Sequence, residues 1–282
     1  MKIGIVGPAE RAVAWEKHLR PHRSVSEVVI AGRLKDIGQV SACLLLDESD
    51  EQLDTLLKAV HSGFHTFLIS KLPTNLEAVE KIYHAAEEAN VRLQFSHWPS
   101  LAPVSQWMSQ KVPKPAFIQT VRDIHYTQHL ETQHGLEHYW VDELAYCLKW
   151  IDKTVHHIDL NTAYLNKNTY ALHLFLRFGN GATANTYINI SSSENRHQRL
   201  ISDDSYLLNC NVLTQTVRLG QENARGQLYF EKKSFDTSKA AELAITHFLK
   251  AIQMKKPAIY HGYDLLRLNR EIAKIKHRMK RL

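Results

Sequence analysis

Lys2-Ile3-Gly4-Ile5-Val6-Gly7 is the stretch of sequence that decides the fold. Its apolar residues are continuous, which is typical of a parallel strand buried on both faces, and the run ends at a glycine. Apolar spacing predicts a helix over 12–19, and Pro8 is tolerated in a first helical turn. The stretch therefore predicts a strand, a tight turn and a helix at the start of a parallel sheet.

The same alternation continues outward from this stretch. Joined by right-handed crossovers, such elements form one parallel sheet. Further strands are predicted at 25–31, 42–46, 66–69 and 91–96, and helices at 53–62 and 76–90.

The pattern changes in the second half of the chain. Residues 172–178 and 183–190 alternate between apolar and polar, with Gly179-Asn180-Gly181 as a turn between them. This pattern predicts a C-terminal α+β domain with a large, mostly antiparallel, open sheet. The proline-containing stretch 100–115 places the boundary, giving domains 1–105 and 106–282, with the last helix packing back on the first. Other strands are predicted at 116–124, 205–219 and 227–232, and helices at 139–151, 240–253 and 264–276.

Composition narrows the protein class. The chain has 282 residues, 44% hydrophobic and 23% charged, and its longest apolar runs are far short of a membrane span. Because the first residues already read as a strand, we expect no signal peptide. We therefore expect a cytoplasmic protein without a membrane partner. The net charge is +6 with a basic C-terminal end, but no aromatic residues alternate with these cations as a nucleic-acid module requires. A solvated helix face explains them, with attraction to anionic ligands as the alternative.

Cysteine and histidine spacing argues against a metal site. The three cysteines Cys43, Cys147 and Cys210 lie far apart without a C-x-x-C pair, which indicates buried thiols in a reducing compartment. His134 and His138 have the spacing of two imidazoles on one helical face, and His125 and His129 precede them. The 17 histidines are scattered through the chain, however, and H-E-x-x-H does not occur. We expect no metal.

Several segments, in this order, resemble the Gfo/Idh/MocA family of NAD(P)-dependent oxidoreductases. The resemblance implies an N-terminal Rossmann-like dinucleotide-binding domain and a C-terminal domain that binds substrate and forms homodimers or homotetramers through its sheet. The segments are KIGIVG at 2–7, AVHSGFHTFLISK at 59–71, PTNLEAVEKIYHAAEEANVRL at 73–93, LRFGNGATANTYI at 176–188 and HFLKAIQMKKPAIYHGYDLLRLNREI at 247–272.

The cofactor motifs depart from the family pattern. Gly7, Ala9 and Ala12 stand where G-x-G-x-x-G/A is usual, with Pro8 and Glu10 between them. The turn either binds the cofactor pyrophosphate or only links strand to helix.

The ribose end of the cofactor motif differs too. Gly32 replaces the acid of NAD-preferring members, and Arg33 beside it suits a 2′-phosphate, so NADP is favoured over NAD unless Arg33 is only a surface residue. Residues 33–40 are too few for the usual helix and strand, which leaves the adenosine side open or remodelled.

The resemblance also implies the catalytic residues. Ser70-Lys71-Leu72-Pro73 corresponds to the family's E-K-P, and Lys71 would orient the substrate. Asp142 and Tyr146 correspond to D-x-x-x-H with tyrosine for histidine, and a phenol needs a lowered pKa to act as a base. His97 matches a G-H position and is the second candidate for proton transfer. The alternative roles are a loop lysine, a surface acid, a packed aromatic and a structural histidine.

These residues imply an oxidoreductase that transfers hydride between a nicotinamide and a small sugar, polyol or similar carbonyl or hydroxyl substrate. The departures leave a second hypothesis, a redox-inactive family member that binds a ligand or a protein. A lyase or isomerase that keeps its cofactor is a third.

Overall fold

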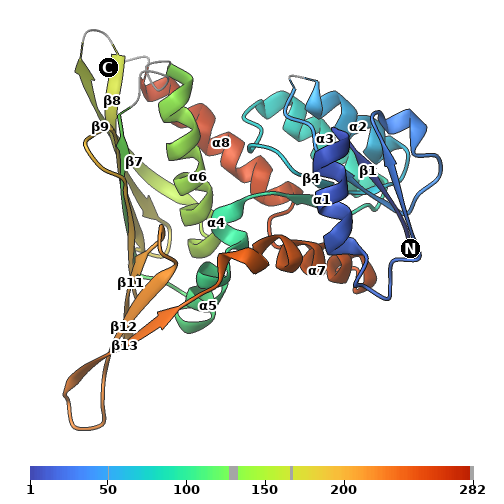
Figure 1. Ribbon diagram of the computed structural model, residues 1–282. Helices are drawn as coiled ribbons and strands as arrows, with labels where there is room; N and C mark the ends of the chain where they lie inside the picture. The colour runs from blue at the N-terminus through green and yellow to red at the C-terminus, as the bar shows by residue number, and fades with distance from the viewer. Residues whose placement is uncertain (50, 127–132, 166–167, 280–282) are drawn as a thin grey trace. The chain divides into compact units, whose positions relative to one another are not determined.

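A computed structural model describes residues 1–49, 51–126, 133–165 and 168–279 (Figure 1). The chain forms two compact units. Unit 1 comprises Met1–Leu101 and Ser238–Arg270, and unit 2 comprises Ala102–Thr237 and Glu271–Leu282. The long helix α8 (Gly262–Met279) begins in unit 1 and ends in unit 2.

Unit 1 is built on a five-stranded parallel sheet with the order β2-β1-β3-β4-β5. The chain leaves β1 toward one edge and then continues toward the other, so right-handed crossovers place α1 on one face and α2 and α3 on the opposite face. Helix α7 packs beside α1 over a core of aliphatic and phenylalanine side chains. The elements are β1 (Lys2–Val6), α1 (Ala9–Leu19), β2 (Glu27–Ala31), β3 (Ala42–Leu45), α2 (Gln52–His61), β4 (His65–Leu68), α3 (Leu76–Glu88), β5 (Leu93–Phe95), α4 (Trp98–Leu101) and α7 (Ala240–Gln253).

The connection between β2 and β3 is short, as predicted. It contains only the 3-10 helix η1 (Leu34–Asp36), so β2 remains the edge strand. Ile37 then folds under β1, where its Cδ1 lies 2.7 Å from the position that a Cβ on Gly4 would take. Gly4 therefore makes room for this shortened connection.

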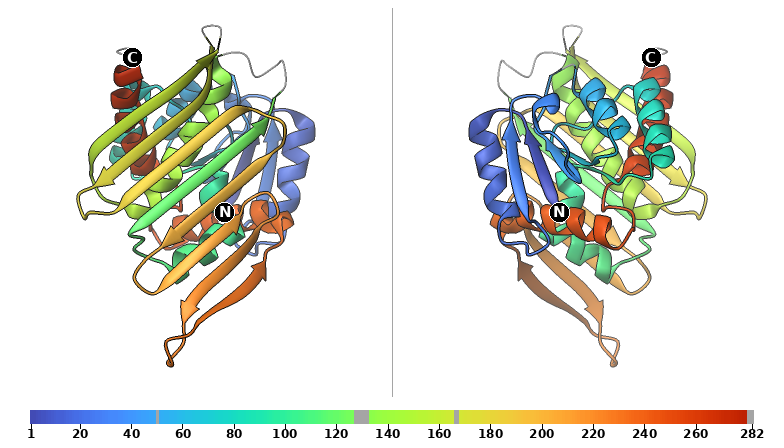
Figure 2. Two further views of the ribbon diagram at one scale, coloured as in Figure 1. Left: turned by 90° about the vertical axis from the view of Figure 1, so that its left-hand side faces the viewer. Right: turned by 90° about the vertical axis from the view of Figure 1, so that its right-hand side faces the viewer.

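Unit 2 is built on an eight-stranded sheet with the order β13-β12-β11-β10-β6-β9-β8-β7. Only the β6–β9 pair is parallel among the pairings in the described residues. Helices α5 and α6 lie on one face, and no described element of this unit covers the other (Figures 1 and 2). The elements are α5 (Pro103–Lys111), β6 (Phe117–His125), α6 (Gln133–Ile151), β7 (Val155–Leu165), β8 (Asn168–Phe178), β9 (Thr183–Ser192), β10 (Arg196–Ser202), β11 (Tyr206–Asn211), β12 (Thr216–Glu222), β13 (Leu228–Ser234) and the 3-10 helix η3 (Thr237–Lys239).

The predicted fold class, a parallel sheet followed by a large and mostly antiparallel one, is confirmed. Helix α7 and the first part of α8 belong to unit 1, although they follow the strands of unit 2 in the chain. Strands β7 and β10 and helix α5 were not predicted. In β10 the residues that face the covered side of the sheet include His197 and Arg199. The strand therefore lacks the alternation of apolar and polar residues by which a half-buried strand is predicted from sequence. Each described helix is too short or too polar to span a bilayer.

Candidate functional site

The carboxyl ends of the parallel strands gather four of the predicted site residues at one edge of the unit 1 sheet. Gly7 follows β1, Arg33 follows β2, Lys71 follows β4 and His97 follows β5. The strand order reverses between β1 and β3, and ligands of open α/β sheets bind at such a reversal, outside the carboxyl ends of the strands.

Gly7 is required by the close approach of the chain after β3. Its φ is +146°, and a Cβ there would lie 2.7 Å from Leu46 Cβ. Two backbone bonds hold the turn: Gly7 N donates to Ala31 O at 3.1 Å, and Leu46 N donates to Val6 O at 2.8 Å. The backbone at this point is therefore fixed and free of side-chain bulk.

Helix α1 begins directly after this turn without a side-chain cap. Pro8 is its N-cap residue and forms no side-chain cap bond, while Ala12 N donates to Pro8 O at 2.9 Å. Pro8, Ala9 and Glu10 are exposed, and Ala12 is buried against the sheet. The first-turn N–H groups therefore remain suited to a phosphate, although Glu10 adds an unfavourable negative charge. The residues present fit a dinucleotide at this turn.

Arg33 lies in open surroundings after β2. Its Nε is 3.2 Å from Asp36 Oδ2, and both side chains are exposed. A Cβ on Gly32 would meet nothing within 4 Å. An exposed ion pair of this kind is worth at most about 1 kcal/mol, so a 2′-phosphate could displace Asp36 at little cost.

The loop that carries Lys71 is held by Ser96, the residue directly after β5. Ser96 Oγ accepts from Ser70 N at 3.0 Å and donates to Ser70 O at 2.7 Å. Ser70 Oγ in turn donates to Lys71 O at 2.9 Å. Lys71 itself is exposed, so this loop presents an amine on a fixed backbone.

His97 is enclosed within unit 1. Its Nδ1 lies 2.7 Å from Ser100 Oγ, and its ring centre lies 4.7 Å from that of Tyr260. These contacts orient the imidazole firmly and also suit the structural role that the sequence left open.

Asp142 and Tyr146 differ in their surroundings, although one turn of α6 separates them. Asp142 is partly exposed, with Oδ2 3.7 Å from Nε2 of His138 on the preceding turn. Tyr146 is buried, and its ring centre lies 3.9 Å from the Arg199 guanidinium carbon. Its hydroxyl lies near Ser105 without a hydrogen bond of standard geometry in the described residues. Burial raises the pKa of Tyr146, whereas a general base needs it lowered.

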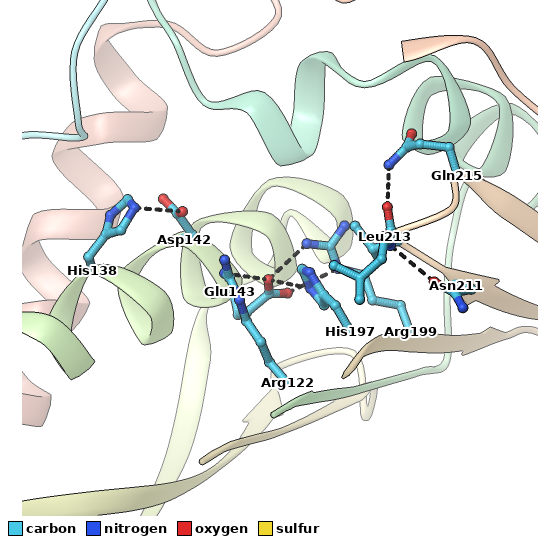
Figure 3. Close-up of polar contacts among 10 residues, drawn as sticks. Arg122, His138, Asp142, Glu143, His197, Arg199, Asn211, Leu213 and Gln215 are labelled. Carbon is cyan, nitrogen blue, oxygen red and sulfur yellow. Dashed lines mark hydrogen bonds and ion pairs between the residues drawn. The ribbon is translucent and has the colours of Figure 1, made fainter. Parts of the chain in front are cut away.

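A buried polar cluster in unit 2 was missed by the sequence analysis (Figure 3). Glu143 is fully buried and accepts from Arg199 Nε and Nη2 at 3.0 and 2.9 Å. His197 Nε2 and Arg122 Nη1 lie 2.9 and 3.5 Å from Glu143 Oε1. Burial alone would raise the pKa of Glu143, but Arg199 and His197 together outweigh it and hold that pKa well below its usual range. The polar pattern of 196–199 was the one available signal for this cluster.

Within the described ranges, no three His, Cys, Asp or Glu side chains lie close enough to hold a metal ion. His129, one of the four histidines considered, lies outside the described residues. All three cysteines are free and buried.

Comparison with known proteins shows which solved structures share the fold of this chain. No family model matches the sequence, and none of the curated proteins is similar to it. Among solved structures, UDP-N-acetylglucosamine 3-dehydrogenase from Acidithiobacillus ferrooxidans superposes with a TM-score of 0.82 at 14% identity, covering 97% of this chain and 96% of that one. This chain therefore has the same fold as that dehydrogenase.

Two further structures agree. A dehydrogenase (MviM) from Clostridium difficile gives a TM-score of 0.78 at 13% identity over 98% of this chain and 99% of its own. An NAD binding oxidoreductase from Klebsiella pneumoniae gives 0.83 at 10% identity over 97% and 95%. The resemblance to Gfo/Idh/MocA proteins is thereby confirmed for the dehydrogenase fold.

Proposed function

We propose that this protein is an NAD(P)-dependent oxidoreductase that transfers hydride between a nicotinamide and a hydroxyl or carbonyl group of a sugar, polyol or similar small molecule. The observation that carries the proposal is the Gly7 turn, which leads into an uncapped helix N-terminus at the point where the strand order reverses. The similarity to a sugar-nucleotide dehydrogenase supports a sugar as substrate.

The cofactor would be held by Gly7, Pro8, Ala9 and Ala12 at its phosphates. Arg33 favours NADP over NAD because a guanidinium pairs well with a 2′-phosphate. Lys71 follows β4, which lies two strands away from β1, and it is at the same edge of the sheet as Gly7. It would therefore lie at the nicotinamide end of the cofactor. When bound, the nicotinamide supplies or accepts the hydride.

The protein's own residues would bind the substrate and move the proton. Lys71 orients the reacting oxygen with its exposed amine. Asp142 and His97 are the proposed proton-transfer and positioning groups, and Asp142 is already paired with His138. Burial encloses the Tyr146 hydroxyl and raises its pKa further above neutral pH, which disfavours proton transfer, so a packed aromatic is the role proposed for it.

Titration with NADPH and NADH, followed by thermal unfolding and nicotinamide fluorescence, tests the proposal. A cofactor at 100 times its dissociation constant adds about 2.7 kcal/mol of stability. Gly7→Ala should remove this shift because the added Cβ collides with Leu46. Gly63→Ala is the matched control, since Gly63 also has a positive φ but precedes β4 at the amino edge of the sheet.

The outcome separates the two main hypotheses. A shift with either nucleotide supports the oxidoreductase, and the larger shift identifies NADP or NAD. If neither nucleotide stabilises the wild type, the redox-inactive ligand-binding protein replaces the proposal. Where turnover is found, Lys71→Ala and Asp142→Asn should each lower kcat/KM at least about a hundredfold, as is usual for acid–base and orienting groups.

Assembly and location complete the proposal. We propose a homodimer or homotetramer formed through the sheet face that no described element of unit 2 covers. Leu207 and Tyr187 are exposed on strands of that sheet, consistent with such an interface. Light scattering of the purified protein measures the number of subunits, and a monomer would contradict it. The expected location is the cytoplasm, and fractionation of cells checks it.

A further inference from the structure

The buried cluster around Glu143 carries more positive than negative charge. One carboxylate faces two guanidinium groups, those of Arg199 and Arg122. Burial lowers the pKa of His197, which disfavours a positive charge on its imidazole. Because Arg199 occupies both oxygens of Glu143, the one ion pair that Arg122 forms with a described residue is a long contact of 3.5 Å to this carboxylate.

Arg122 is also the member of this cluster that reaches solvent. Its side chain is 19% exposed, compared with 1% for Arg199 and 8% for His197. The Arg122 guanidinium carbon lies 4.4 Å from the ring centre of Tyr139 on α6. Stacking of this kind fixes the plane of a guanidinium while its N–H edge remains able to bind an oxyanion through two parallel hydrogen bonds.

The cluster lies between α6 and two strands of the unit 2 sheet. Glu143 follows Asp142 on α6, and Arg122 lies on β6 beside His197 of β10 (Figure 3). A partly buried cation that lacks a full partner is costly unless a ligand provides the missing negative charge.

We propose that Arg122, oriented by Tyr139 and Glu143, binds an oxyanion of the substrate, and that the substrate is therefore a sugar or polyol carrying a phosphate or carboxylate group. The identification of the bound molecule as the substrate rests on the proposed function. The binding of an anion beside α6 does not depend on it.

Calorimetric titration without nicotinamide tests the inference. The probes are inorganic phosphate, UDP, glucose 6-phosphate, glucuronate and glucose. We expect at least one anionic probe to bind the wild type and glucose to bind far more weakly. Binding by phosphate esters alone identifies a phosphate site, and binding by glucuronate alone identifies a carboxylate site.

Three variants locate the site. Arg122→Met keeps the apolar stem and should weaken the anionic probe at least tenfold, whereas Arg122→Lys should retain part of the affinity. Tyr139→Leu should weaken the probe several-fold through loss of the stacked ring. Arg225→Met, in an exposed turn, is the matched control and should bind as the wild type does.

Two results overturn the inference: no anionic probe binds the wild type, or folded Arg122→Met binds the anion unchanged. If Arg122→Met fails to fold, Tyr139→Leu and Arg122→Lys decide, and wild-type affinity in both contradicts the site. Anion binding without any response to NADPH or NADH would leave this site standing while the oxidoreductase proposal fails.

Discussion

Glu143 is a residue at which burial and charge act in opposite directions. Burial opposes its ionisation, yet Arg199 and His197 together keep its pKa well below the usual carboxyl range. The unfolded chain takes up a proton near the ordinary pKa, whereas the folded one does not. Its contribution to stability is therefore fully present above the ordinary pKa and is lost as pH falls toward the lower folded value.

We expect Glu143→Gln to lower the free energy of unfolding at pH 7 by about 3–5 kcal/mol, because Arg199 then remains buried without a counter-charge. The variant should also lose stability less steeply in acid than the wild type does. Urea unfolding from neutral to acidic pH measures both effects. Glu194→Gln, at an exposed position, is the control. Wild-type stability in Glu143→Gln would contradict the buried ion pair.

At the scale of elements, α1 shows how one helix can be suited and unsuited to the same ligand. Its N-terminus lacks a side-chain cap and directs free N–H groups outward, but Glu10 stands in its first turn. A negative charge there stabilises the helix itself and repels a phosphate. The sequence of this turn therefore balances helix stability against affinity for an anion.

Glu10→Gln should tighten binding of NADPH about two- to fivefold, because it removes the repelling charge while the N–H groups stay in place. Fluorescence titration of the nucleotide measures this change. The control is Glu88→Gln, which alters the same charge at the end of α3. Unchanged or weaker binding in Glu10→Gln would place the cofactor phosphates elsewhere.

At the scale of the whole molecule, the three buried cysteine thiols are divided between the two units. Burial raises the pKa of Cys43 and Cys147 to about 12 and that of Cys210 to about 11. Cys43 lies in unit 1, and the other two lie in unit 2. The thiols therefore report on the opening of each unit.

We expect the native protein to react negligibly with a disulfide reagent at pH 8, and all three thiols to react after unfolding. If the two units open separately in intermediate urea, the thiols should react in two phases with amplitudes of one and two. Absorbance of the released thiolate measures both. A thiol that reacts fast in the native protein would show that its surroundings are open.

Local sequence pattern determined the two sheets of this protein. Continuous apolar runs ending at Gly7 and Ile69 indicated buried parallel strands, and alternation in 172–190 indicated the half-buried antiparallel ones. The same positions brought Gly7, Arg33, Lys71 and His97 to one sheet edge, because parallel strands end together. These inferences succeed because periodicity and turn chemistry are properties of neighbouring residues.

Tertiary structure alone decided the surroundings of the residues on α6. Tyr146 lies under Arg199, and Glu143 meets Arg122, His197 and Arg199 from strands β6 and β10, far away in the chain. No local pattern encodes which distant cation a carboxylate meets, and the charged inward face of β10 concealed that strand. Pairing of buried charges depends on the packing of elements distant in sequence, so only the folded chain reveals it.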